Sequence, residues 1–136
     1  MIKISAILLT LSMAIYSQSI VNSKHNLSVS GSGDIKATSE SEICIFCHTP
    51  HQSSPRKPLW NRQDPGSVYE IYNTSTTDAS AGQPDGSSLL CLSCHDGTIA
   101  LGDVLSRAQP IEFSGGISVM PPGTSNLTTN LSDDHP

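Results

Sequence analysis

Aromatic and charged residues are scarce in this chain. Phe, Tyr and Trp together make up 4% of its 136 residues, and Asp, Glu, Lys and Arg together make up 14%. The few charges are mostly acidic, with a net charge of −5 at pH 7, which argues against nucleic acid and anionic lipid as partners. A chain so poor in large apolar side chains would struggle to bury a core of its own. We therefore expect the polypeptide to need added apolar material in order to fold.

No hydrophobic run in the sequence reaches the ~20 residues that a membrane-spanning helix needs. The longest one, Ile4 to Ile15, follows the basic Lys3 and is broken only by Ser and Thr. Small polar residues come next, which is typical of a secretory signal peptide with cleavage after Ser19 or Ser23. We expect residues 1–23 to be this signal and residues 24–136 to form one exported domain. The expected location is the periplasm or the cell exterior, with no stable membrane insertion.

Cysteine occurs at only four positions, all within two matching strings. These are Cys44-Ile45-Phe46-Cys47-His48 and Cys91-Leu92-Ser93-Cys94-His95. Both strings are C-x-x-C-H, the attachment signature of c-type haem. The two thiols bind the vinyl groups of one haem, and the following His is placed to bind its iron. The sequence thus predicts two haem c groups, with His48 and His95 as the proximal iron ligands.

Zinc and dithiol chemistry are the alternatives for these cysteines. Two C-x-x-C pairs could form a four-cysteine zinc site, and one pair alone could be a redox dithiol. Zinc ribbons usually place roughly 15–20 residues between their pairs, whereas 43 residues separate Cys47 from Cys91 here. A zinc site would also leave His48 and His95 unexplained. Haem is therefore favoured, and a secreted zinc-binding domain is the alternative.

The expected fold class is a mostly irregular chain with a few short α-helices around covalently bound haems, as in a small multihaem cytochrome c. Ser39 and Glu42 match a capping box, which predicts a helix from Glu40 to His48. A second helix is predicted over 87–95, followed by a turn at 96–97, and residues 117–119 are a weak strand candidate. The aromatic side chains expected to pack against haem edges are Trp60, Tyr69 and Tyr72.

Three further histidines, His25, His51 and His135, are candidate distal iron ligands, whereas Met120 is expected to pack in the core. The Cα atoms of His48 and His51 lie at most ~11 Å apart along the chain. Two imidazoles on opposite faces of one iron need Cα atoms roughly 12–13 Å apart. We therefore expect His51 to serve the haem at Cys91 and Cys94, which leaves His25 or His135 for the first haem.

Several strings of the sequence resemble the multihaem c-type cytochromes with doubled C-x-x-C-H motifs, which are secreted electron carriers of respiring bacteria and archaea. The resemblance extends to extracellular cytochromes that polymerise into haem filaments. It implies that His25, His51 and His135 are distal ligands. The strings that carry it are residues 24–31 (KHNLSVSG), 44–51 (CIFCHTPH), 58–61 (PLWN), 91–98 (CLSCHDGT) and 133–136 (DDHP).

The resemblance implies an exported carrier of electrons in anaerobic or extracellular respiration, not an enzyme. Its partners would be redox proteins, including other cytochromes or identical subunits. An oxidoreductase subunit with an open iron position is the alternative, but five histidines for four axial positions argue against it. Such cytochromes usually continue past D-H-P to further haem strings, so residues 24–136 are either a dihaem domain or part of a longer cytochrome. With three distal candidates for two haems, one His could also serve a neighbouring subunit.

Overall fold

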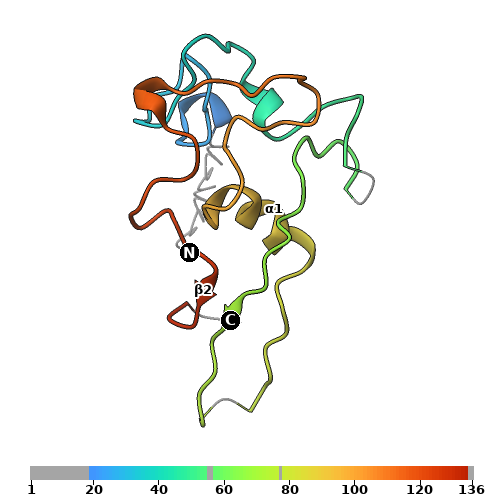
Figure 1. The fold of residues 1–136 in the computed structure, drawn as a ribbon, viewed down its shortest axis with the longest axis vertical. Helices are drawn as coiled ribbons and strands as arrows, with labels where there is room; N and C mark the ends of the chain where they lie inside the picture. Colours follow the sequence, from blue (N-terminus) through green and yellow to red (C-terminus); the bar gives the residue numbers. More distant parts are fainter. Residues whose placement is uncertain (1–18, 55–56, 77, 135–136) are drawn as a thin grey trace, which may run out of the picture.

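The chain forms very little regular secondary structure. The computed structural model describes residues 19–54, 57–76 and 78–134 (Figure 1). This confirms the predicted irregular chain, although a single α-helix takes the place of the several that were expected among these residues. Their elements in chain order are η1 (Ile20–Asn22), η2 (Ile43–Phe46), β1 (Glu70–Ile71), α1 (Gly86–His95), η3 (Ser114–Gly116) and β2 (Asn130–Leu131), where η marks a short 3₁₀ helix.

Helix α1 contains the second cysteine string and agrees with the predicted helix, beginning one residue earlier. It ends at His95, because Asp96 donates its N–H to the Leu92 carbonyl and Gly97 then takes a positive φ of 72°. Only glycine adopts this conformation readily. The Asp96 carboxylate accepts hydrogen bonds from the N–H and hydroxyl of Thr98, both at 2.8 Å, which fixes the predicted turn.

The first cysteine string forms only the single 3₁₀ turn η2, and the predicted capping box is wrong. Glu42 is the residue before η2 and makes no side-chain capping bond. Instead, the Glu40 carboxylate accepts the N–H of Glu42 at 2.8 Å. The helix cannot continue to His48, because the Cys47 carbonyl accepts the N–H of Asn61 and the main chain of His48 pairs with that of Trp60. A contact distant in sequence therefore overrides the local helix signal.

The small sheet joins two segments that are distant along the chain. Strands β1 and β2 are parallel, with Glu70 opposite Asn130 and Ile71 opposite Leu131. The strand predicted over 117–119 is wrong: this segment is irregular, and Ser118 contributes its carbonyl to the N–H of Leu101. No helix among the described residues is long and apolar enough to cross a membrane.

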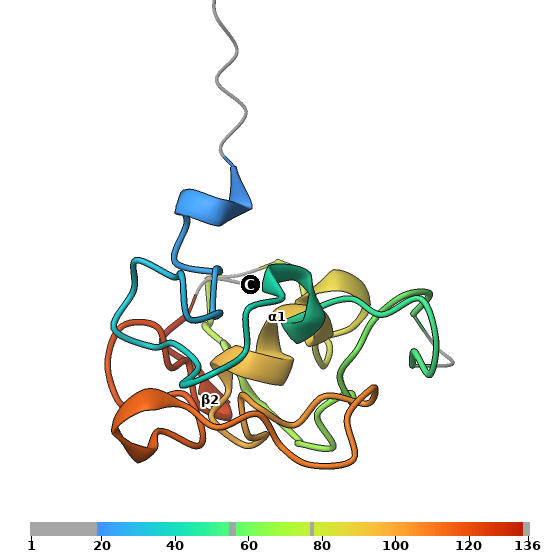
Figure 2. The same ribbon diagram turned by 90° about the horizontal axis from the view of Figure 1, so that it is seen from above.

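The hydrophobic core is small and lies beside η2. Met120 belongs to it, as expected from the sequence, and the rings of Phe46 and Phe113 meet edge to face at 5.8 Å. Its buried members are Ala37, Ile45, Phe46, Leu101, Phe113 and Met120. In both views α1 lies among the loops that precede and follow it (Figures 1 and 2), and in Figure 1 the segment between β1 and α1 extends away from them.

Candidate functional site

The two cysteine strings present their thiols in the same way. Cys44 and Cys91, the first of each pair, are exposed, whereas Cys47 and Cys94 pack against the core, and all four are free thiols. Burial, together with the nearby Cys94, raises the pKa of Cys47 to about 11. Burial also raises the pKa of Cys94. Cys94 therefore lies close enough to Cys47 to influence its pKa.

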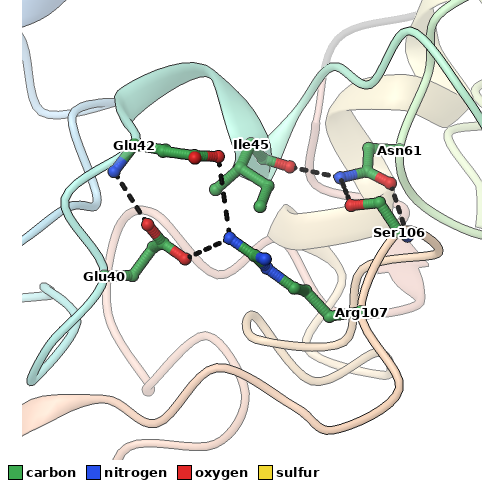
Figure 3. Close-up of polar contacts among 6 residues, drawn as sticks. All are labelled: Glu40, Glu42, Ile45, Asn61, Ser106 and Arg107. Atoms are coloured by element: carbon green, nitrogen blue, oxygen red, sulfur yellow. Dashed lines mark hydrogen bonds and ion pairs between the residues drawn. The ribbon is translucent and has the colours of Figure 1, made fainter.

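Asn61 ties the first string to a distant loop (Figure 3). Its side chain is fully buried and donates to the Ile45 carbonyl at 2.6 Å and to the Ser106 hydroxyl at 2.8 Å. Its side-chain oxygen accepts the N–H of Ser106 at 2.9 Å. Its main-chain N–H bonds the Cys47 carbonyl. Beside this network, Arg107 forms ion pairs with Glu40 at 3.0 Å and Glu42 at 3.6 Å.

Arg62, the next residue, ties in the second string. Its side chain is fully buried, and its guanidinium donates twice to Ser93, to the carbonyl at 2.8 Å and to the hydroxyl at 3.3 Å. It also donates to the carbonyls of Leu101 at 2.8 Å and Ala100 at 3.0 Å. Sequence reasoning missed Asn61 and Arg62 as links between the strings. The only signal was their position at the end of the P-L-W-N string, of which Asn61 is the last residue and which Arg62 directly follows.

His95 is held in an orientation that suits a metal ligand. Its Nδ1 lies 2.6 Å from the Ser125 carbonyl. A carbonyl can only accept, so Nδ1 is the donor, and in the neutral imidazole Nε2 then keeps its lone pair. Metal-binding histidines are usually oriented in this way by a hydrogen bond on the other nitrogen.

His25 lies directly against His95. Their ring centres are 6.2 Å apart, and the ring planes are inclined at 67°. Among the described residues, it is therefore His25, and not His51, whose ring contacts the histidine of the second string. His51 is exposed, and its main chain is held by the Thr49 hydroxyl.

A compact loop positions His25. The buried Asn26 side chain accepts the Ser28 hydroxyl at 2.7 Å and donates to the Val21 carbonyl at 2.9 Å. Gly31 closes the loop, because a Cβ there would lie 2.0 Å from the Asn26 carbonyl oxygen. The H-N-L-S-V-S-G string thus has a local structural explanation.

His48 is exposed and contacts Trp60, with ring centres 5.9 Å apart. The Trp60 indole N–H is buried and has no hydrogen-bond acceptor among the described residues. His135 lies outside the described residues. Within the described part of the chain, no three His, Cys, Asp or Glu side chains gather as a metal-binding group. The four cysteines therefore do not form a tetrahedral zinc-type cluster.

A cavity adjoins the first cysteine of each string. One, of about 510 Å³, is lined by Cys44, His48 and Arg107 among others. The other, of about 530 Å³, is lined by Cys91, Tyr72 and Leu131 among others. Both volumes are typical of small-molecule and cofactor sites, roughly 300–1,000 Å³. Tyr72 thus lines the cavity beside Cys91, whereas Tyr69 is not among the residues that line it. Tyr69 is buried and donates its hydroxyl to Asp96 at 2.7 Å.

Comparison of the chain with protein-family models gives no match. Comparison with curated proteins also gives no match.

Proposed function

We propose that this protein is an exported c-type cytochrome that carries electrons through two covalently bound haems. The observation that carries the proposal is the placement of His25 beside His95, the histidine of the second string. Two iron–nitrogen bonds of about 2 Å, plus roughly 1.2 Å from each nitrogen to its ring centre, give about 6.4 Å between ring centres. The separation of 6.2 Å therefore leaves room for one iron between the two imidazoles.

The residues of the second string suit such a group. Cys91 and Cys94 are three apart on α1, so their thiols emerge on the same side of the helix, and His95 follows with Nε2 available. Haem iron takes at most two axial protein ligands, so a histidine pair would be sufficient without a larger metal-binding cluster. Cys91 also lines a cavity bounded by Tyr72 and Leu131.

The first string would hold the other haem through Cys44 and Cys47, with His48 as the proximal ligand. The buried indole N–H of Trp60 beside His48 is a donor that a carboxylate of a bound cofactor could satisfy. His51 is excluded as the opposite ligand by its short chain distance from His48. With His25 assigned to the second iron, His135 is the remaining candidate of this chain for the first.

Each bound iron would supply a reversible change between Fe(III) and Fe(II). The chain contributes the positions of the two attachment sites, since Cys47 and Cys94 pack against one core. Groups attached there would lie close together, and short separation favours electron transfer between them. Because His25 and His95 together would fill both axial positions of one iron, no open position remains there for a substrate. This arrangement favours an electron carrier over an oxidoreductase subunit.

The expected setting is anaerobic or extracellular respiration, with redox proteins, other cytochromes or identical subunits as partners. The test is the visible spectrum of the protein exported from a host that attaches haem c. We expect a six-coordinate, low-spin spectrum with a haem-to-protein ratio of two. A colourless product that carries zinc would overturn the proposal, and rapid carbon monoxide binding at both reduced haems would contradict the assigned histidine pair.

A further inference from the structure

We propose that Arg62 is a fixed internal positive charge that raises the reduction potential of both haems. This inference rests on the proposed function and adds a positioning residue that neither binds iron nor attaches haem. The inference starts from two contacts. The buried guanidinium of Arg62 is hydrogen-bonded to Ser93 of the second cysteine string, and the preceding residue, Asn61, is hydrogen-bonded to Cys47 of the first.

The charge of Arg62 is buried but not neutralised by its hydrogen-bond partners. Its side chain is fully buried, and its five N–H groups match five acceptors, the longest contact reaching the Asp103 main-chain carbonyl at 3.5 Å. All five acceptors are uncharged oxygens: four main-chain carbonyls and one hydroxyl. They compensate the lost hydration of the guanidinium, but they leave its net charge in place. They also leave no N–H for a further ligand.

The same side chain lies between the two strings. Ser93, which accepts two of its hydrogen bonds, directly precedes Cys94. The preceding residue, Asn61, donates its main-chain N–H to the Cys47 carbonyl at 2.9 Å.

The expected effect has a definite sign. Reduction adds one electron to a haem, so a nearby positive charge favours the reduced form and raises the potential. A buried charge acts more strongly than a surface charge, because the local dielectric constant is lower and salt screens it less. Asp96, the other buried charged residue among those described, has the opposite sign and follows His95 directly. The negative charge of Asp96 should therefore offset the effect of Arg62 less at the haem attached to Cys44 and Cys47 than at the haem attached to Cys91 and Cys94.

The test is a spectroelectrochemical titration of the haem-loaded protein and its variants. Arg62→Gln removes the charge and is expected to lower both potentials, whereas Arg62→Lys keeps the charge and should stay near the wild-type values. Arg107→Gln is the matched control, because Arg107 is 43% exposed and paired with Glu40 and Glu42. It should produce a smaller shift, confined to the first haem. Haem content and unfolding by denaturant are measured for every variant.

A second variant that neutralises the charge keeps the inference testable if Arg62→Gln fails to fold. Ser93→Asp places a carboxylate beside the guanidinium and should also lower both potentials. Wild-type potentials in a neutralising variant that holds both haems would overturn the inference, as would an equal lowering in Arg62→Lys. Loss of haem from both neutralising variants would make the role of Arg62 structural and also overturn it. Absence of haem from the wild-type protein would instead overturn the proposed function, and the spectrum shows this before any titration.

Discussion

At the scale of single residues, one hydrogen bond orients the ring of His95 and one tight loop places His25 beside it. The Ser125 carbonyl fixes the proton of His95 on Nδ1, and the loop around the buried Asn26 places the second ring 6.2 Å away. The sequence indicated both histidines as ligand candidates. It could not pair them, because they are 70 residues apart and only the folded loops bring them together.

This pairing predicts different effects for two histidine substitutions. His25→Ala should convert the haem at Cys91 and Cys94 to the high-spin form, because its iron loses the ligand opposite His95. His51→Ala, a matched change at an exposed residue, should leave that haem low-spin. Electron paramagnetic resonance of the oxidised proteins measures both states. A spin change at the second haem in His51→Ala, with none in His25→Ala, would restore the assignment that chain distance alone suggested.

Asn61 carries the clearest prediction for stability. Truncation by Asn61→Ala removes the side-chain bonds to Ile45 and Ser106 and leaves their buried polar groups unpaired. We expect a loss of about 2–4 kcal/mol in the free energy of unfolding. Denaturant titration measures it, and Asn73→Ala at an exposed position is the control. Equal stability of the two variants would show that Asn61 does not join the first string to the loop at Ser106.

At the scale of elements, the two cysteine strings show what local sequence can and cannot predict. Both were expected in short helices. The second became α1, because the outside main-chain partner, Leu127, bonds only the carbonyl of the last helical residue, His95, and a glycine turn ends the helix. The first stopped after one turn, because Asn61 and Trp60 bind the main chain at Cys47 and His48. The parallel pairing of β1 with β2 also depends on contacts distant in sequence. Each strand is only two residues long, so the local sequence carries no pattern that predicts it.

Glu40, which replaces the capping box, predicts a small dependence of stability on pH. The N–H of Glu42 and then Arg107 lower the pKa of this carboxyl from its ordinary value of 4.5. A lowered pKa adds stability above the ordinary value, and this stability is lost as the pH falls through the lowered one. Glu40→Gln should therefore be slightly less stable than the wild type at pH 7 and no less stable at pH 3. Denaturant titrations at the two pH values measure the difference; an equal loss at both would exclude a role for the carboxylate charge.

At the scale of the whole molecule, the polypeptide alone has little to hold it together. Its buried core contains six residues among those described, and two cysteines at the edge of that core are proposed attachment points. Covalently bound macrocycles would add apolar surface where the chain lacks it. The scarcity of aromatic residues predicts this dependence, although composition could not show that both proposed attachment sites adjoin one core.

The unloaded chain should consequently behave as largely unfolded. Protein made without haem attachment should react with iodoacetamide at similar rates at all four cysteines at pH 8. In a chain that folds alone, Cys47 and Cys94 would react much more slowly than Cys44 and Cys91, because burial raises their pKa and blocks access. Peptide mass spectrometry after timed alkylation gives the four rates, with guanidinium-unfolded protein as the reference. Marked protection of Cys47 and Cys94 would show that the chain folds without its cofactor.

The central claim is that Cys44 with Cys47, and Cys91 with Cys94, each attach one haem. Intact-mass spectrometry of the exported protein, after extraction with acid acetone, tests it most directly. The wild type should retain the mass of two haems, and each of the double variants Cys44→Ser/Cys47→Ser and Cys91→Ser/Cys94→Ser should retain one. A wild-type mass equal to that of the bare polypeptide, with or without bound zinc, would contradict the claim.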